Sequence, residues 1–235
     1  MGDPRTPEWE QGMNSRPAAE ETAPRRAPLS QERILETALR LADEEGLRSL
    51  SMRRLASELG FEPMALYRHF PNKAAIIDGV VGAVWAEMAL LSEQEDPWDR
   101  LRELSRSFRH LALAHPNVFP ALANRPVYLR GAMRPVEVAL ETFQAAGFDD
   151  AGAVHAFVSL VAYVYGYALR EIAGLFGTEE GAQVLWYDLH RVPGQWFPAI
   201  VKLAPQFAGY DFDASFERGL EAMLSGLRAT AGQTH

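Results

Sequence analysis

Cysteine is absent from this 235-residue chain, and the absence removes several kinds of site at once. Without thiols the protein can form no disulfide, no thiolate metal site and no cysteine nucleophile. Long apolar runs are also lacking: no stretch of about 18 uninterrupted apolar residues occurs, so we expect no spanning helix and no membrane partner. The amino terminus has no basic start followed by an apolar run, so we expect no secretion. These features together fit a cytoplasmic protein.

Catalytic and metal-binding patterns are missing as well. The chain has no Gly-x-Ser-x-Gly elbow, no glycine-rich phosphate loop and no His-Glu-x-x-His pair. Its six histidines are scattered, at positions 69, 110, 115, 155, 190 and 235, without the spacing of metal ligands. We therefore expect no catalytic residue, no metal and no cofactor, and a helical enzyme is the competing class of protein.

Helical periodicity runs through almost the whole chain after Ser30, and no segment alternates like a strand. The expected helices cover residues 34–46, 51–59, 63–70, 72–91, a stretch beginning at 97, a stretch ending at 146, and residues 149–175 and 216–227. A loop with one or two shorter helices should fill 176–210. The predicted fold class is all-α.

Three segments follow from this pattern. Residues 1–28 are polar, contain five prolines and show no hydrophobic period, so they predict a disordered tail. Residues 29–75 predict a small unit of three helices. Residues 76–230 predict a larger helical domain, since they are long enough to bury a core of their own.

The segment around residue 60 predicts two short helices joined by a tight turn, the geometry that sets a helix into a DNA groove. Ser51 can cap the first helix, and Gly60 can end it because glycine adopts the left-handed backbone that other residues avoid. Pro63 suits the first turn of the second helix. The buried positions would be Met52, Leu55, Ala56 and Leu59 in the first helix and Leu66 and Phe70 in the second.

The same segment is locally positive. Between Arg48 and Lys73 there are five basic and two acidic side chains, whereas the whole chain has a net charge of −8. A basic island in an acidic protein is expected where phosphates are bound. An ordinary surface hairpin is the simpler alternative, but it would not need this charge, and we predict binding to double-stranded DNA. Arg25 and Arg26 of the tail could enter a minor groove or belong to a solvated leader.

At these residues the sequence resembles the Tet repressor family of bacterial transcription regulators. Leu50–Gly60 and Leu66–Lys73 match that family's helix-turn-helix almost position for position, and the similarity runs from about Ser30 to Val84. The part from Asp96 to Leu227 is similar to the tetracycline-repressor-like branch. Matching residues there are Trp98, Ser107, Phe108, Arg109, His115, Arg125, Pro126, Gly147, Phe148, Gly166 and the segment 216–227. The resemblance implies a helix-turn-helix domain followed by a larger domain for ligand binding and dimerisation.

Side-chain chemistry predicts how DNA is contacted. Tyr67, Lys73 and the hydroxyl of Ser51 can donate to phosphates, which position a protein without reading sequence. Arg53 and Arg68 are long enough for a base edge. The full predicted set is Ser51, Arg53, Arg54, Pro63, Met64, Ala65, Tyr67, Arg68, His69 and Lys73.

Part of this set departs from the family. Pro63, Met64 and Ala65 stand where the family often carries polar residues, so they offer apolar surface for thymine methyl groups and little hydrogen-bond readout. His69 is open to two interpretations, a backbone contact to DNA or a structural side chain.

The larger domain should hold an effector pocket. The resemblance favours Phe108, Asn124 and Arg125 as effector contacts, and we add Tyr163 and Arg170. The metal-binding histidine of the tetracycline branch has no counterpart near Ala121, Leu122 and Ala123, and Arg170 replaces a glutamate that supports the metal. Magnesium-bound tetracycline is therefore not expected, and a neutral or anionic apolar molecule is.

Specific reading of DNA normally needs a two-fold dimer, because one module covers only one half-site. The resemblance implies that the helices 149–175 and 216–227 pair with their mates in a four-helix bundle. Small residues that would permit close approach are Ala153, Ala156, Gly166, Gly219 and Gly226. We expect a homodimeric repressor released by a small hydrophobic molecule; the alternative is a regulator whose larger domain binds a protein or no effector.

Overall fold

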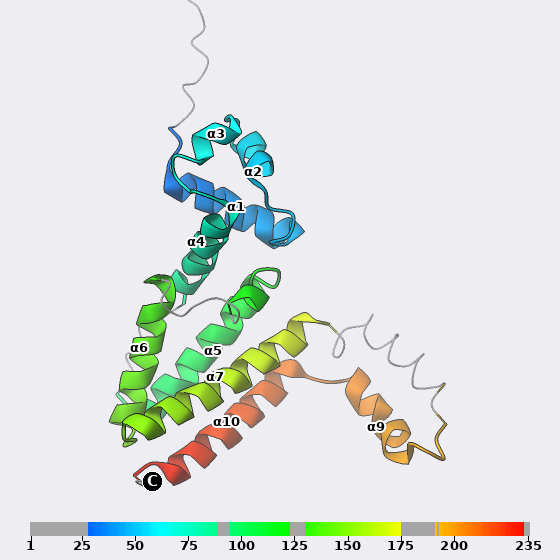
Figure 1. The fold of residues 1–235 in the computed structure, drawn as a ribbon. Helices are drawn as coiled ribbons and strands as arrows, with labels where there is room; N and C mark the ends of the chain where they lie inside the picture. The colour runs from blue at the N-terminus through cyan, green and yellow to red at the C-terminus, as the bar shows by residue number, and fades with distance from the viewer. Residues whose placement is uncertain (1–27, 89–94, 123–129, 175–190, 192, 233–235) are drawn as a thin grey trace, which may run out of the picture.

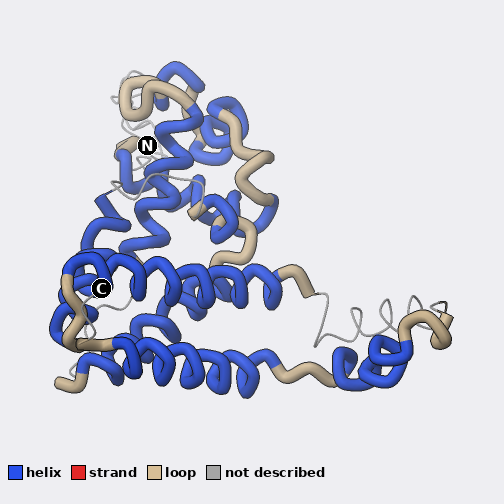
Figure 2. Tube along the Cα trace, turned by 60° about the horizontal axis from the view of Figure 1, so that its bottom comes forward, coloured by secondary structure: helices blue, strands red, loops and turns tan. Residues whose placement is uncertain are grey.

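The computed structural model describes residues 28–88, 95–122, 130–174, 191 and 193–232. Within these ranges the secondary structure is helical without a strand, which confirms the all-α prediction (Figure 2). The tail predicted for residues 1–28 lies outside the described residues except for its last position.

The amino-terminal unit is built from three helices, α1 (Gln31–Glu45), α2 (Met52–Leu59) and α3 (Pro63–Leu66). A fourth helix, α4 (Lys73–Ala86), leads out of this unit towards the larger domain (Figure 1). Because α1 packs on α4 and α4 packs on α6, this one helix contacts both parts of the molecule.

The larger domain is a helical bundle. Its elements are α5 (Pro97–Ala114), the short 3₁₀ helix η2 (Phe119–Ala121), α6 (Arg130–Ala145), α7 (Asp150–Ile172), α9 (Pro198–Ala208) and α10 (Phe212–Thr230). Helices α5, α6 and α7 pack on one another, and α10 packs on α5 and α7. Helix α9 stands apart from this bundle in both views (Figures 1 and 2).

Polar side chains begin these helices, as was predicted for Ser51. Ser51, Asn72, Asp96, Asp149 and Asp211 each accept a hydrogen bond from a backbone N–H in the first turn of the helix that follows. Such a cap satisfies one of the free donors at a helix start. Because Asp211 is the cap used, α10 begins four residues before the predicted start at 216.

The second helix of the helix-turn-helix is shorter than predicted. It ends at Leu66, and the backbone N–H groups of His69 and Phe70 both donate to the carbonyl of Leu66, which closes a turn in place of a further helical turn. Gly60 has φ +74°, the left-handed backbone predicted for it. Leu66 and Phe70 are buried, so the core prediction is confirmed although the helix length was wrong.

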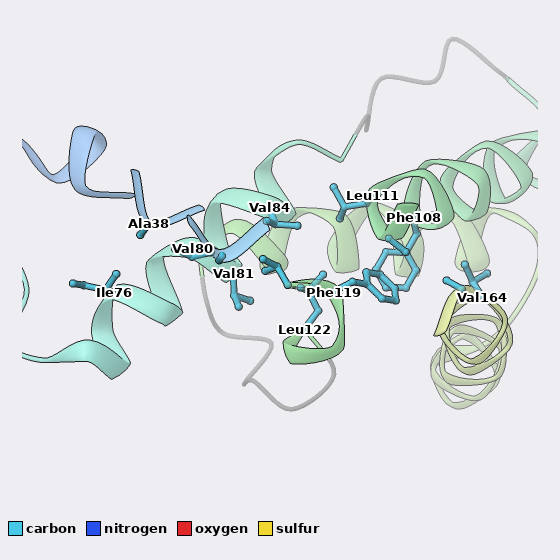
Figure 3. Packing of buried hydrophobic residues seen from close by; sticks show 14 of the residues in the cluster. Ala38, Ile76, Val80, Val81, Val84, Phe108, Leu111, Phe119, Leu122 and Val164 are labelled. Atoms are coloured by element: carbon cyan, nitrogen blue, oxygen red, sulfur yellow. The ribbon is translucent and has the colours of Figure 1, made fainter. Parts of the chain in front are cut away.

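One apolar core joins the two parts. Ile76, Val80, Val81 and Val84 of α4 are buried, and Figure 3 shows them in a row that continues towards the side chains of α5 and η2. A Cβ atom added at Gly79 would lie 2.4 Å from a methyl carbon of the α1 residue Leu35, so α1 approaches α4 closely at that glycine. Movement of α4 must therefore disturb both parts.

Helix α7 is long and apolar. Its most apolar 18-residue window has a mean hydropathy of 1.4, enough by length and composition alone to cross a membrane, although a core helix passes the same test. Only 28% of that window is buried within the subunit. The helix also carries His155, Arg170 and Glu171, charges or dipoles that lipid would not solvate. Its exposed apolar surface is therefore a face that another protein surface can cover.

Candidate functional site

The exposed surface of the helix-turn-helix combines apolar, phenolic and cationic groups. Met64 of α3 is 72% exposed and Tyr67, directly after α3, is 45% exposed. Arg68 and the α2 residue Arg53 are exposed as well. Phosphates accept hydrogen bonds from phenol and guanidinium groups, so this surface has the chemistry of a nucleic-acid interface.

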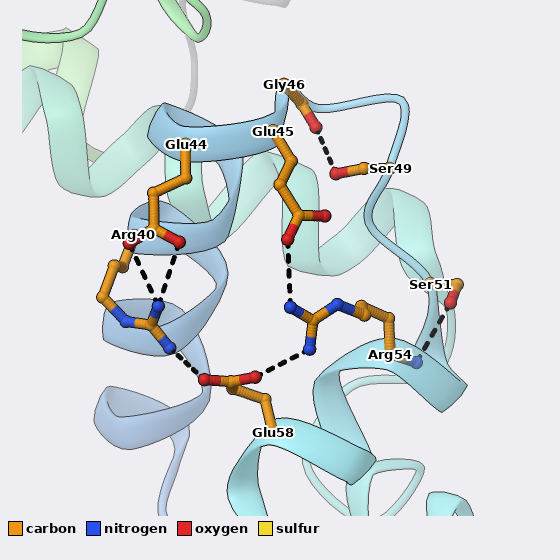
Figure 4. A network of polar contacts seen from close by, with 8 residues as sticks. All are labelled: Arg40, Glu44, Glu45, Gly46, Ser49, Ser51, Arg54 and Glu58. Carbon is orange, nitrogen blue, oxygen red and sulfur yellow. Dashed lines mark hydrogen bonds and ion pairs between the residues drawn. The ribbon is translucent and has the colours of Figure 1, made fainter.

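Arg54, one of the predicted DNA contacts, takes part in a network of ion pairs. Its guanidinium bonds to Glu58 of its own helix at 2.7 Å and to Glu45 of α1 at 3.0 Å. Glu58 is shared with Arg40 of α1, which also bonds to Glu44 (Figure 4). The hydrogen bonds from Arg54 and Arg40 lower the pKa of Glu58. The network links α1 to α2, but its members are half-exposed, so solvent screening leaves each pair a small contribution to stability.

Lys73 and Ser51, two other predicted DNA contacts, form hydrogen bonds within the protein but still have N–H or O–H groups that could donate to phosphate. The Lys73 ammonium donates one hydrogen bond to the carbonyl of Arg48 at 3.2 Å, and an ammonium has three such donors. The Ser51 hydroxyl accepts from the N–H of Arg54 and keeps its own O–H to donate. The half-buried His69 contributes its backbone carbonyl, which accepts from the side chain of Gln31.

A cavity of about 370 Å³ lies in the larger domain. Helices α4, α5, α6 and α7 all contribute to its wall, which contains no charged side chain among the described residues. The lining side chains are Trp85, Met88, Leu101, Leu104, Ser105, Phe108, Leu122, Pro135, Val136, Ala139, Phe143, Phe157, Val158, Leu160, Val161, Ala162, Val164 and Tyr165. No carboxylate or imidazole stands in this set, so the described wall lacks the usual protein ligands of Mg²⁺ and Zn²⁺.

Aromatic rings stack beside the cavity. The ring centroids of Trp85 and Phe108 are 5.2 Å apart and their planes differ by 10°. The ring of Phe119 has its centroid 5.3 Å from that of Phe108 and 5.0 Å from that of Tyr165. The two hydroxyl groups of the wall already donate within the protein: Ser105 to the carbonyl of Leu101, and Tyr165 to the carbonyl of Pro120. The wall is therefore apolar in effect as well as in composition.

The predicted effector contacts are distributed unevenly. Phe108 lines the cavity, whereas Asn124 and Arg125 lie outside the described residues. Tyr163 and Arg170 do not line it: the Tyr163 hydroxyl donates to the carbonyl of Phe216 in α10, and Arg170 is exposed. Residues two positions apart on a helix point in nearly opposite directions, so Tyr165 faces the cavity where Tyr163 cannot.

A helical pattern in α7 would have revealed this arrangement. Val158, Val161 and Tyr165 follow the i, i+3, i+7 spacing of one face and line the cavity, while Tyr163 belongs to the opposite face against α10. The presence of tyrosine alone does not separate these faces, because Tyr165 lies on one and Tyr163 and Tyr167 on the other.

His115, after α5, joins the two parts of the molecule. Its Nδ1 lies 2.9 Å from a carboxylate oxygen of Asp43 in α1, and its Nε2 lies 2.8 Å from one of Glu87 at the end of α4. Burial opposes a charged imidazolium, yet the hydrogen bonds to Glu87 and Asp43 outweigh it and raise the pKa of His115 above its ordinary value. Asn117 also donates to the backbone carbonyl of Asp43 at 2.7 Å. The end of α1, the end of α4 and the loop after α5 thus meet at one joint.

Comparison with known proteins agrees with this architecture. Residues 34–80 match the family model described as bacterial regulatory proteins, tetR family, and residues 91–231 match the tetracyclin repressor-like C-terminal domain. The chain is 30% identical to an HTH-type transcriptional regulator of Saccharopolyspora erythraea, over 87% of this chain and 86% of that protein. It is 31% identical to the HTH-type transcriptional repressor DrrR1 of Streptomyces coeruleorubidus, over 89% and 82% of the two chains.

A solved structure has a similar fold. ActR of Streptomyces coelicolor, in complex with actinorhodin, superposes with a TM-score of 0.76 at 33% identity, covering 88% of this chain and 100% of ActR. These relatives are transcriptional regulators, so the enzymatic alternative is set aside. With its helix-turn-helix and its tetracycline-repressor-like larger domain, the chain belongs to the Tet repressor family of DNA-binding transcriptional regulators.

Proposed function

We propose that this protein is a homodimeric cytoplasmic repressor that leaves its operator when a small, uncharged, apolar molecule enters the cavity. The observation that carries the proposal is the cavity itself, which touches α4, the helix that leads to the DNA-binding unit. Its volume of about 370 Å³ falls within the usual range for small-molecule sites, roughly 300–1,000 Å³.

The chemistry of the wall selects the ligand. A charged group would lose its hydration in the cavity without gaining an opposite charge or a free hydrogen-bond partner from the described wall, which is costly. Apolar surface gains roughly 25 cal/mol per Å² on burial, so an uncharged hydrophobic molecule is favoured. The anionic ligand that the sequence allowed is less well supported, since Arg170 does not reach the cavity.

The relatives support both the effector and the direction of control. ActR has been solved with a small molecule, actinorhodin, and DrrR1 is named a repressor. In the proposal the present chain likewise binds a small molecule and represses. A larger domain that binds a protein, or no effector, is the second candidate.

Exposed apolar surface supports the dimer. Val154 and Val158 on α7 are 51% and 57% exposed, and space is open beside Gly166 of α7 and Gly226 of α10. Helix α9, which stands apart from the bundle, exposes the apolar side chains of Ile200, Val201, Leu203 and Phe207 (Figure 1). A second copy that covers these faces would remove a large apolar surface from water, as obligate dimers do.

Not all the small residues predicted for the dimer serve it. Ala153 and Ala156 are buried within the subunit. A Cβ atom at Gly219 would lie 2.2 Å from the Tyr163 hydroxyl oxygen, so that glycine allows α7 and α10 of one subunit to pack closely. The proposed interface therefore relies on Gly166 and Gly226.

Coupling between the sites would run through α4. Trp85 and Met88 at the end of this helix line the cavity, and Glu87 between them bonds to His115. A ligand that displaces Trp85 would also move the joint that holds α1. Because reading heads must match half-sites about one helical turn apart, a shift of a few ångström would break simultaneous contact.

The experiment is a ligand screen with a variant that fills the cavity. The neutral fluorescent probe N-phenyl-1-naphthylamine and a set of uncharged aromatic compounds are tested by fluorescence and thermal shift. Ala139→Trp should abolish binding, whereas Ala114→Trp, at an exposed alanine of α5 outside the cavity, should not. If no uncharged compound raises the melting temperature while a dimer still binds DNA, the second candidate is correct.

A further inference from the structure

The second helix of a helix-turn-helix enters the major groove, and in this chain that helix, α3, carries no hydrogen-bonding side chain. Helix α3 consists of Pro63, Met64, Ala65 and Leu66, and Leu66 is fully buried in the core. The side chains that α3 offers to a partner are therefore apolar throughout. Direct reading of bases from α3 cannot use the donor and acceptor pairs that arginine, asparagine or glutamine supply.

Met64 dominates this apolar surface. Its side chain is 72% exposed, which leaves a large hydrophobic group in water at a cost that only a partner can recover. The thioether chain is unbranched and has three rotatable bonds, so it can adapt to a shallow apolar feature.

The surroundings of Met64 identify the partner. Exposed groups flank α3 in the chain: the carboxylate of Glu62 precedes it, the phenol of Tyr67 and the guanidinium of Arg68 follow it, and Arg53 is exposed on α2. Two guanidinium groups against one carboxylate leave this surface net positive, so an apolar tip with cationic and hydrogen-bonding groups near it in the chain suits a surface that is negatively charged at its edges and apolar at one spot. The major groove of DNA has this form, because phosphates border it and the 5-methyl group of thymine is its apolar group.

We propose that Met64 is a specificity-determining residue which reads thymine through its 5-methyl group, so that each operator half-site contains a thymine opposite α3. The inference rests on the proposed function, since it requires operator binding. It deepens that function by naming the chemical group that is read. Pro63 and Ala65, which are half-buried and short, allow Met64 to project beyond them.

The size of the effect follows from the methyl group alone. Moving one CH₂-sized group from water into an apolar contact on binding raises the affinity about fourfold. Two half-sites read by two copies would give roughly fifteenfold for the complete operator. Loss of phosphate contacts would not produce this pattern, because those contacts do not depend on the base.

The experiment removes one methyl group at a time. The operator is first isolated by selecting bound duplexes from a random pool with the full-length protein. Each thymine is then replaced by deoxyuridine, which lacks only the 5-methyl group, and affinities are measured for the unaltered protein, Met64→Ala and Met64→Leu. Met133→Ala, at a methionine of α6 that is 56% exposed and distant from the helix-turn-helix in sequence, is the matched control.

The expected result is a loss of about fourfold per half-site at one thymine position for the unaltered protein and for Met133→Ala. Met64→Ala should bind the thymine and deoxyuridine operators equally, and Met64→Leu should restore part of the difference. The proposal is overturned if no deoxyuridine position weakens binding, or if Met64→Ala loses as much as the unaltered protein. Failure to select any specific duplex would instead overturn operator binding, on which the proposal rests.

Discussion

Replacement of His115 by phenylalanine should loosen the joint between the DNA-binding unit and the larger domain. Hydrogen bonds to charged groups contribute roughly 1.5–3 kcal/mol each. The Glu87 side chain is 48% exposed, so solvent screening reduces the contribution of its hydrogen bond to His115 to about 1 kcal/mol. The Asp43 side chain is only 28% exposed, so its hydrogen bond to His115 contributes most of that range. His115→Phe should therefore lower the free energy of unfolding by about 2–4 kcal/mol at pH 6.

The loss should depend on pH in a definite direction. An imidazolium donates a hydrogen bond from each nitrogen, one to Asp43 and one to Glu87, whereas neutral imidazole has only one donor. Because the pKa of His115 is raised in the folded state, its contribution is complete below the ordinary value near 6.5 and disappears as the pH rises through the raised value. The difference in free energy of unfolding between the unaltered protein and His115→Phe should decrease between pH 6 and pH 9.

Urea unfolding of both proteins across this pH range provides the measurement, and the slopes with urea must agree for the comparison to hold. Asn117→Ala is the control, since it removes a neutral hydrogen bond to the backbone of the same Asp43 and should show no such pH dependence. A gap of constant size from pH 6 to pH 9 would refute the charged joint.

Three further predictions concern the other contacts. Arg106→Ala should lower the free energy of unfolding by up to about 1 kcal/mol at pH 7 and leave it unchanged in acid. The hydrogen bond from Arg106 lowers the pKa of Glu217, so the stabilisation is lost as the pH falls through that lowered pKa; measuring unfolding at decreasing pH tests this. Gly219→Ala should destabilise the chain by roughly 1–3 kcal/mol in urea, because the added Cβ meets a tyrosine of α7, while Gly82→Ala in α4, where space is open, should not. Tyr67→Phe should weaken binding to every DNA sequence alike and reduce the salt slope of binding by about one.

Local patterns predicted much of the fold. The buried positions of the helix-turn-helix, the cap at Ser51 and the left-handed Gly60 all follow from interactions within a few residues of each other. The all-α class and the family followed from periodicity and from the helix-turn-helix motif. These features are local, so a single sequence contains them.

Contacts between distant segments could not be predicted in the same way. The ion pair between Arg54 and Glu45 was not predicted, because Glu45 lies on another helix and becomes a neighbour only when α1 and α2 cross. The same reason applies to His115, whose two carboxylate partners are 72 and 28 residues away in the chain. Tyr163 was assigned to the cavity from its type, although its helical spacing from Val158, Val161 and Tyr165 puts it on the other face of α7, where it packs against α10.

The affinity of the cavity for its ligand, measured with and without operator, tests the central claim most directly. The ligand is the uncharged compound that stabilises the protein most in the screen and fails to stabilise Ala139→Trp. Binding is measured by fluorescence, first with the free protein and then with the protein saturated by the selected operator. Linkage requires that operator weaken ligand by the same factor by which ligand weakens operator, and such couplings are typically about 5- to 150-fold. We predict weakening of this size; equal affinity in the two measurements would contradict the coupling of the cavity to DNA through α4.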